Sequence, residues 1–143
     1  MATIKLEIVS PDKVVYTADI NMLIVRSTAG ELGILPHHAP LVAGLIPHAM
    51  RAKLEGKEEL IAIAGGFMEV QPEKISVLAS AAELPIDIDV LRAQRSYARA
   101  KERLEALKNG THHDIDETID SRRAELALHR AVARLTAAGQ DIQ

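Results

Sequence analysis

The sequence contains no cysteine and no tryptophan, and its only aromatic residues are Tyr16, Phe67 and Tyr97. The absence of cysteine excludes disulfide bonds, thiolate catalysis and cysteine-ligated zinc, and it fits a reducing compartment. Because aromatic side chains are so few, a hydrophobic core has to be built from Ile, Leu, Val and Ala.

Long apolar runs are also missing. No stretch approaches the roughly 20 apolar residues of a membrane-spanning helix, and residues 1–9 alternate in polarity, unlike a secretory signal peptide. We therefore expect any membrane contact to go through a partner. The formal net charge of −3 argues against a general nucleic-acid binder. The 143 residues, 48% of them apolar, are enough for one ordinary domain or two very small ones.

Catalytic motifs are absent as well. The sequence has no G-x-S-x-G around a serine, no H-E-x-x-H and no G-x-x-x-x-G-K-[ST]. His112 and His113 precede Asp114, but adjacent side chains rarely converge on one ion, and a solvated loop is the better interpretation. We therefore predict no catalytic residues and no metal site.

The spacing of apolar residues changes near Pro85. Before this proline the period is two: Ile4, Leu6 and Ile8 alternate with polar residues, as in a strand with one buried face. Turn signals separate further predicted strands, which are Val14–Tyr16, Ile20–Arg26, Ile34–Leu35, Leu41–Ile46, Met50–Leu54, Leu60–Ala64, Phe67–Val70 and Ile75–Leu78. Many short strands indicate an antiparallel sandwich or barrel.

The chain after Pro85 is dominated by good helix formers. Asp87 or Asp89 can cap a first helix, which we expect to end near Lys108 because Asn109-Gly110 is a stop signal. A second helix is predicted from about Asp116 or Thr118 to about Ala138. The short connection predicts a hairpin, so the sequence divides into residues 1–84 and residues 85–143.

The apolar faces of both helices are narrow. The predicted stripes are Leu91, Ala98, Leu104 and Leu107 on the first helix and Ile115, Ile119, Leu126, Val132 and Ala133 on the second. Because alanine buries little area, we expect a weak seam and a hairpin that can open. A permanently closed hairpin is the alternative.

Four arginines stand out in the helical half. Arg92 and Arg99 share one helical face, and Arg130 and Arg134 share another. In a hairpin that folds near residue 113 all four can converge on one seam, where a triphosphate would neutralise them. An ordinary solvated basic face, balanced by nearby glutamates, is the alternative.

One segment of the first half combines two glycines with a proline. The run Gly30-Glu31-Leu32-Gly33-Ile34-Leu35-Pro36 predicts a sharp loop with unusual backbone dihedral angles. Glu31 and His38 would then lie near each other on one rim. A structural turn with solvent-facing polar residues is the alternative.

At these residues the sequence resembles the epsilon subunits of bacterial rotary ATP synthases. The glycine-containing run, continued by His38-Ala39-Pro40-Leu41, is similar to the signature loop of that family. The segment Gly65-Gly66-Phe67-Met68-Glu69-Val70 is similar to a second signature. The resemblance covers essentially the whole chain, although the family's usual glycine before His38 is replaced here by His37.

The resemblance implies a ten-stranded antiparallel β-sandwich followed by an antiparallel two-helix hairpin. It implies a non-catalytic rotor subunit of a proton-translocating ATP synthase, bound to the gamma subunit and the c-ring at the cytoplasmic face of the bacterial membrane. Glu31 and His38 match positions near the c-ring contact. The hairpin is expected to extend into the alpha/beta catalytic hexamer and restrain ATP hydrolysis.

The segment Ile88-Asp89-Val90-Leu91-Arg92-Ala93 is similar to the I-D-x-x-R-A signature of epsilon subunits that bind ATP in the folded hairpin. This resemblance implies ATP as a regulatory ligand, with or without Mg²⁺. The implied site consists of Glu83, Ile88, Asp89, Arg92, Ala93, Arg99, Arg130 and Arg134. The loop Lys108–Thr118 is longer than in many relatives, so Arg122 or Arg123 are alternatives on the second helix.

A free-standing ATP sensor with no role in assembly is the rival function. The segment between Glu31 and His38 discriminates between the two functions, because a soluble sensor has no need for a rim directed at a membrane ring.

Overall fold

The computed structural model describes residues 2–109 and 116–140. Ten strands come first, then a 3₁₀ helix and two α-helices. The strands are β1 (Ile4–Val9), β2 (Val14–Ile20), β3 (Met22–Ser27), β4 (Gly30–Ile34), β5 (Leu41–Leu45), β6 (His48–Leu54), β7 (Lys57–Ile63), β8 (Gly66–Val70), β9 (Lys74–Ala79) and β10 (Ala82–Glu83). The helices are η1 (Pro85–Asp87), α1 (Val90–Asn109) and α2 (Asp116–Ala137).

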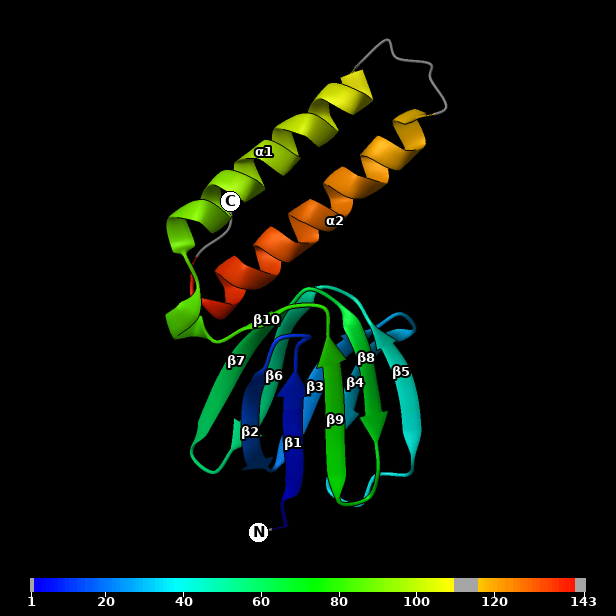
Figure 1. The fold of residues 1–143 in the computed structure, drawn as a ribbon, viewed down its shortest axis with the longest axis vertical. Helices are drawn as coiled ribbons and strands as arrows, with labels where there is room; N and C mark the ends of the chain where they lie inside the picture. The colour runs from blue at the N-terminus through cyan, green and yellow to red at the C-terminus, as the bar shows by residue number, and fades with distance from the viewer. Residues whose placement is uncertain (1, 110–115, 141–143) are drawn as a thin grey trace.

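The strands form one sheet that folds over on itself. Its order is β10-β7-β6-β3-β5-β8-β9-β1-β2, with β4 beside β3, and β2 also lies against β6. The result is a ten-stranded sandwich with the two-helix hairpin at one end (Figure 1). The predicted fold class is therefore confirmed. One described pairing departs from the antiparallel expectation, because β1 runs parallel to β9 with Leu6 opposite Ile75.

The core lies inside the sandwich and is aliphatic, as the period of two predicts. Ile4, Leu6 and Ile8 of β1 are at most 1% exposed, whereas Lys5 between them is exposed. The largest fully buried side chains of the described residues all come from strands between Ile4 and Ile75. Burying each such side chain contributes roughly 1.5–3 kcal/mol, so most of the stabilising apolar burial belongs to this part of the chain.

Residues 30–34 form strand β4, and the predicted sharp loop at this place is wrong. Exposure alternates along the strand, with Glu31 exposed, Leu32 half-buried and Ile34 buried. Two glycines suggested a loop, but Gly30 has a φ of +122° where β3 turns into β4, whereas Gly33 pairs with Ile24 inside the ladder. Alternation of polarity was the stronger signal.

A sharp turn does follow β4, at Leu35–His38. The His38 N–H donates to the Leu35 carbonyl oxygen at 3.2 Å, Pro36 is the second residue, and His37 has a φ of 64°. This arrangement fits a type II turn, whose third position usually takes glycine. His37 thus adopts a glycine-like conformation. Its N–H donates to the Pro72 carbonyl oxygen at 3.0 Å, which ties the turn to the β8–β9 connection.

The other predicted strands are confirmed with shifted ends. For example, β2 extends to Ile20, β6 begins at His48 and β7 begins at Lys57. The sequence pattern predicts no strand at Ala82–Glu83, because β10 is only two residues long and simply adds to the edge of β7.

Among the described residues of α1 and α2, the buried side chains are alanines and one leucine, Leu135, which is 3% exposed. Ala93 and Ala100 on α1 are at most 5% exposed, and Ala124 and Ala131 on α2 are 2% exposed. Small side chains let two helix backbones approach closely, but each buries little area. The small alanine side chains agree with the expected narrow apolar faces, and the opening of the hairpin stays a prediction.

The predicted helical stripes are correct only in part. Ala133 is buried, and Leu104, Leu107 and Val132 are half-buried. The prediction is wrong at Leu91, which is 65% exposed, at Ala98, which is exposed, and at Leu126, which is 42% exposed. Ile115 and the side chain of Ile119 lie outside the described residues.

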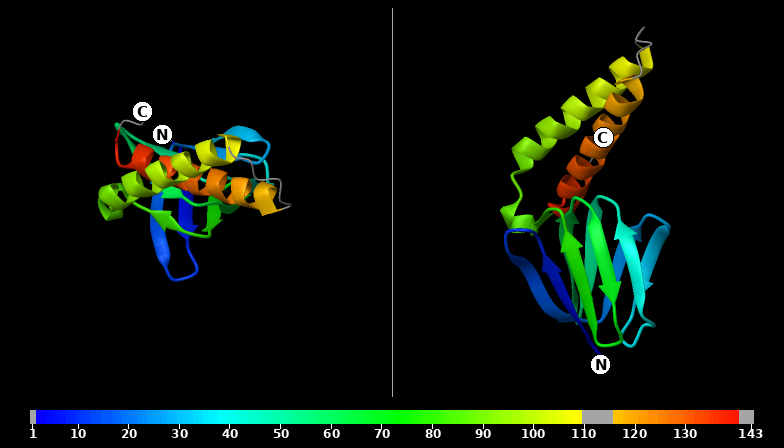
Figure 2. Two further views of the ribbon diagram at one scale, coloured as in Figure 1. Left: turned by 90° about the horizontal axis from the view of Figure 1, so that it is seen from above. Right: turned by 45° about the vertical axis from the view of Figure 1, so that its right-hand side comes forward.

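Only α2 of the two helices packs extensively on the sandwich, where its C-terminal part lies on β6 and β7. Away from this contact the hairpin leans outward, so α1 and the first turns of α2 project beyond the sandwich (Figure 2). Ala137 packs with Ala62 of β7 and Ile88 of the connection in a small second cluster. The hairpin is therefore attached over a limited area.

Candidate functional site

The connection between sandwich and hairpin ends at Asp89, which caps α1. Its Oδ1 accepts the Arg92 N–H at 3.1 Å, and its backbone carbonyl oxygen accepts the Ala93 N–H at 3.0 Å. Of the two predicted caps, Asp89 holds this position, and Asp87 lies in η1. Such a cap stabilises a helix by about 1 kcal/mol, so Asp89 has a structural role in addition to any contact with a ligand.

Glu83 and Arg134 meet where the sandwich faces the hairpin. Arg134 Nε lies 2.8 Å from Glu83 Oε1, and Arg134 Nη2 donates to Glu83 Oε2 at 3.3 Å. The side chains are 22% and 32% exposed, respectively, so water screens the pair only in part. This ion pair links β10 to the C-terminal end of α2.

The four arginines singled out in the sequence are distributed over different places. Arg134 faces Glu83, whereas Arg92, Arg99 and Arg130 are exposed. Arg99 lines a hollow of about 270 Å³ between the two helices, together with Arg103 and Arg123 but with none of the other three predicted arginines. The predicted convergence of all four on one seam is thus not what the structure has.

Arg103 is a basic residue of this hollow that the sequence reasoning missed, and Arg123 was only an alternative. Arg103 follows Arg99 by one helical turn, and that spacing was the available signal. Arg103 Nη2 lies 3.8 Å from Asp120 Oδ1 on α2, so one acidic group already approaches the cluster.

Ile88 and Ala93 of the implied ATP site are 8% and 0% exposed. Ile88 packs with Ala62 and Ala137. Ile88 therefore serves the attachment of the hairpin in this state, whereas Ala93 is a buried residue of α1. The assignment of these eight residues to ATP remains a prediction.

Glu31 and His38 lie at opposite ends of the sandwich, and their predicted proximity is wrong. Glu31 pairs with Arg26 near the end that carries α2, whereas His38 follows the turn beside Pro72 at the other end. The strand between them is β4, whose residues each rise about 3.3 Å. Because residues 30–34 are a strand and not a loop, the two side chains are separated by its length.

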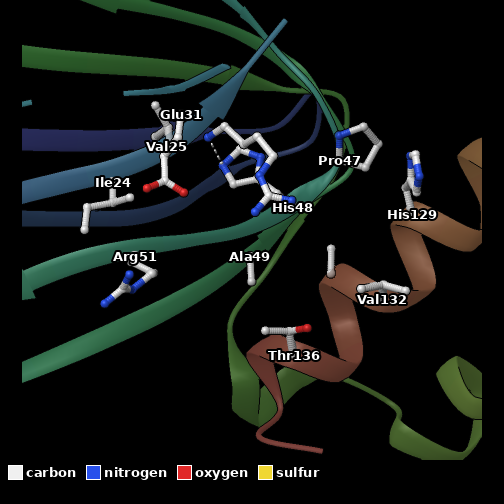
Figure 3. Close-up of a pocket in the computed structure, with 12 residues that line it drawn as sticks. Ile24, Val25, Glu31, Pro47, His48, Ala49, Arg51, His129, Val132 and Thr136 are labelled. Atoms are coloured by element: carbon white, nitrogen blue, oxygen red, sulfur yellow. Dashed lines mark hydrogen bonds between the residues drawn. The ribbon is translucent and has the colours of Figure 1, made fainter. Parts of the chain in front are cut away.

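A cavity of about 400 Å³ lies between α2 and the sandwich (Figure 3). Strands β3, β4 and β6 supply its floor, and α2 covers it with His129, Val132, Ala133 and Thr136. Its charged and titratable side chains are Arg26, Glu31, His48, Arg51 and His129.

His48 is 8% exposed and is held at both ring nitrogens. Its Nε2 accepts the Arg26 N–H at 3.0 Å, which requires the proton to be on Nδ1, and Nδ1 lies 2.6 Å from the Ile46 carbonyl oxygen. Burial, the main cause, lowers the pKa of His48 below its ordinary value. His48 is therefore neutral here, and its Nε2 takes the place of a backbone carbonyl oxygen as the acceptor for the Arg26 N–H of β3.

Within residues 2–109 and 116–140, no group of three or more His, Cys, Asp or Glu side chains is placed to hold a metal ion. The run His112-His113-Asp114 lies outside the described residues. In the same part of the chain, no helix has the length and apolar character needed to cross a bilayer.

Comparison with known families identifies both halves. The model of the ATP synthase, Delta/Epsilon chain, beta-sandwich domain matches residues 3–85. The model of the ATP synthase, Delta/Epsilon chain, long alpha-helix domain matches residues 87–139. The chain belongs to the ATP synthase delta/epsilon family. Members of this family are non-catalytic subunits, which agrees with the prediction that the chain is not an enzyme.

Relatives in this family match the chain from end to end. The ATP synthase epsilon chain of Halalkalibacterium halodurans is 47% identical over 140 residues, which cover 98% of this chain and 100% of the relative. The epsilon chain of Bacillus velezensis is 49% identical over 139 residues, covering 97% and 99%. The resemblance drawn from the two signature segments is thereby confirmed.

A solved structure shows the same fold. A chain in the structure of the Euglena gracilis mitochondrial ATP synthase, described as OSCP/F1/c-ring in rotational state 1, superposes with a TM-score of 0.75 at 22% identity. The alignment covers 98% of this chain and 83% of that chain. The arrangement of sandwich and hairpin is therefore one that the family fold includes.

Proposed function

We propose that this chain is the epsilon subunit of a bacterial rotary ATP synthase, where it belongs to the central-stalk rotor and joins the gamma subunit to the c-ring. Relatives named epsilon chain match it over nearly their whole length, hairpin included. In this role the chain is held at the cytoplasmic face of the membrane by its partners and not by a span of its own.

The observation that carries this proposal is an apolar row on the outside of the sandwich. Val42 on β5, Phe67 on β8 and Leu78 on β9 are 72%, 64% and 59% exposed. Phe67 and Leu78 are direct partners in the β8–β9 ladder, and Val42 is two residues from Gly44, the β5 partner of Phe67. These three side chains therefore share one face of three adjacent strands.

The hairpin does not cover this row, because α2 packs on β6 and β7. Large exposed apolar side chains that cluster on one face mark a site of protein contact. We assign this face to the gamma subunit, the partner that a central-stalk role requires.

Replacing Phe67 and Leu78 together by serine should weaken binding to purified gamma subunit by at least tenfold, measured by surface plasmon resonance. Val14 on β2 is 58% exposed but lies outside the row, so Val14→Ser is the matched control. Unchanged binding in the double variant would remove this face from the assignment. Failure of the wild-type chain to bind gamma at all would favour a free-standing ATP sensor.

The hairpin is the regulatory part of this proposal: it restrains ATP hydrolysis by extending along gamma to the alpha/beta hexamer. An alanine seam and a limited attachment support a hairpin that can leave the sandwich. Arg122, Arg123 and Arg130 on α2 are exposed and can meet acidic surfaces of the catalytic subunits.

Arg134 already pairs with Glu83 in the docked state, so its removal would also change docking. The sharper test therefore replaces Arg122, Arg123 and Arg130 by alanine and retains Arg134. ATP hydrolysis by the assembled enzyme should rise, whereas Arg95→Ala, on the other helix, should leave it unchanged. Equal rates in the triple variant and the wild type would exclude charge attraction as the source of inhibition.

ATP is the ligand that we assign to the docked hairpin. Arg92, Arg99 and Arg130 present exposed guanidinium groups, and guanidinium forks match phosphate oxygens. A ligand that binds only the docked state would stabilise it by about 2.7 kcal/mol at a hundredfold excess over its Kd. The Glu83–Arg134 pair fits a supporting role in which it holds the two parts together around the ligand.

Calorimetric titration of the full chain with ATP, with and without Mg²⁺, tests this assignment. Because Asp89 caps α1, Asp89→Ala would confuse loss of a helix cap with loss of a ligand contact. Asp89→Ser removes the carboxylate but retains a capping oxygen, so it is used in the test in place of Asp89→Ala. We expect Asp89→Ser combined with Arg92→Ala to abolish ATP binding with the fold intact, and full affinity would refute the site.

A further inference from the structure

His48 is a buried titratable group for which the proposed function has no use. It begins β6, and its ring occupies the place where β6 diverges from β3. The ring bridges the Arg26 N–H and the Ile46 carbonyl oxygen, so both nitrogens are in use in the neutral form. A second proton on Nε2 would set a donor against the Arg26 donor and break this bridge.

The position of His48 connects this chemistry to the hairpin. His48 lies in the floor of the cavity under α2, and His129 faces the same cavity from the helix (Figure 3). His48 is 8% exposed, and α2 forms one wall of the cavity that it lines. When α2 leaves, the ring gains contact with water and its charged form is penalised less.

The positive charge of Arg26 acts in the same direction, because it lowers the pKa of His48, whereas Glu31 raises it. Arg26 of β3 and Arg51 of β6 are positive, and Glu31 of β4 is the single carboxylate among the side chains that line the cavity. Arg51 also pairs with Glu58, with Nη2 3.0 Å from Oε2. A proton added to His48 therefore meets the positive charge of Arg26, with Glu31 as the one carboxylate of this lining.

We propose that His48 is a proton-sensitive element that releases α2 from the sandwich when the surrounding solution becomes acidic. The neutral ring accepts the Arg26 N–H of β3 and lies in the floor of the cavity beneath the docked helix. The protonated ring breaks its bridge to the Arg26 N–H and adds its charge to that of the Arg26 side chain. Acid therefore shifts the chain toward the undocked hairpin.

The direction follows from linkage. Burial lowers the pKa of His48 below its ordinary value in the docked state. We infer that departure of α2 relieves part of this burial, so that the undocked state binds the proton more tightly and docking weakens as the pH falls below the undocked pKa. Each unit of difference between the two pKa values changes the docking equilibrium about tenfold once the pH is below both. We expect a loss of docking of this size between about pH 7.5 and about pH 5.

The absence of cysteine gives a direct measurement. Asp19→Cys on the sandwich and Glu102→Cys on α1, both at exposed positions, provide the only two thiols for a fluorescent donor and acceptor on the full chain. Energy transfer should fall on acidification in this protein. With His48→Gln added, which keeps an uncharged acceptor near Arg26, the response should disappear. His38→Gln, at the far end of the sandwich, should respond like the parent.

Several outcomes would overturn the inference. They are a flat response of the parent protein, an unchanged response with His48→Gln, or loss of sandwich circular dichroism at the same pH as the loss of transfer. If His48→Gln does not fold, NMR titration of the His48 ring in the parent protein decides. A ring titration that coincides with hairpin release supports the inference, and one that does not refutes it.

The inference rests on the proposed mobility of the hairpin. Measuring energy transfer with added ATP as well as with acid tests the role of His48 and the mobility of the hairpin separately. Response to ATP without response to acid refutes the role of His48 alone. Response to acid without response to ATP supports it and refutes the ATP assignment. Response to neither refutes the hairpin mobility as well.

Discussion

Removal of the Glu83–Arg134 ion pair should release the hairpin while leaving the sandwich folded. The two side chains are about three-quarters and two-thirds buried, and one charge-assisted hydrogen bond joins them. Exposed pairs contribute about 0–1 kcal/mol, whereas loss of one partner of a buried pair costs about 3–5 kcal/mol. For this half-screened pair we expect about 1.5 kcal/mol, which lowers the docking constant about tenfold.

Amide hydrogen exchange is the suitable assay, because it reports each element separately. In Glu83→Gln, exchange in α2 should accelerate about tenfold, with exchange in β1 and β9 unchanged. The matched control is Glu58→Gln, which removes an exposed ion pair to Arg51 within the sandwich. It should leave the hairpin as it is.

A double-mutant cycle with Arg134→Gln isolates the pair. The coupling energy should be about 1 kcal/mol, so the double variant should exchange little faster than either single variant. Strictly additive effects would mean that the two side chains contribute independently. Faster exchange across the sandwich as well would mean that the pair stabilises the whole fold and not the docking of α2.

Three further predictions concern the sandwich. Gly66→Ala should lower the free energy of unfolding in urea by about 3 kcal/mol, because a Cβ at φ +147° collides with the Leu78 carbonyl oxygen. Gly56→Ala, at φ +76°, meets no neighbour and should lower it by about 1 kcal/mol. Similar losses in the two variants would contradict the clash. His37→Gly should raise stability by about 0.5–1 kcal/mol, because glycine adopts the positive φ of the turn freely, and a lower thermal midpoint would contradict this. Arg51 lowers the pKa of Glu58, so Arg51→Gln should raise the Glu58 pKa toward its ordinary value in a carboxyl NMR titration. Because a depressed carboxyl pKa stabilises the fold above the unfolded value and not below it, the variant should lose less stability on acidification, and an equal loss would contradict the pairing.

The sandwich was predictable because its signals are local and repeated. The alternation in β1 buries Ile4, Leu6 and Ile8, and turns fall at the expected Gly and Pro residues. Asp89 begins α1 and Asn109 ends it, as capping chemistry requires. The parallel pairing of β1 with β9 was not predictable, since it joins distant segments and depends on how the sheet closes.

The helical faces and the arginine cluster could not be placed from the sequence, for a physical reason. Leucine was taken to mark the buried face, but in this hairpin alanines such as Ala93 and Ala100 are buried and Leu91 is exposed. Close helix packing selects small side chains, so the larger apolar residue is a poor guide to the seam. Because consecutive residues differ by about 100° around a helix, arginines placed relative to a wrongly assigned face are misplaced as well.

The difference in side-chain size also explains why docking can be regulated at all. The sandwich buries isoleucine, leucine and methionine, each contributing roughly 1.5–3 kcal/mol, so one surface contact is a small fraction of its burial free energy. Apart from Leu135, the buried apolar residues in the described part of α2 are alanines such as Ala133 and Ala137, whose methyl groups contribute about 0.8 kcal/mol each. Against such a small total, one ion pair, one ligand or one proton is a large fraction of the docking free energy. A docking surface made throughout of large aliphatic side chains would remove that sensitivity. A docking surface with no apolar contact would leave no docked state to control.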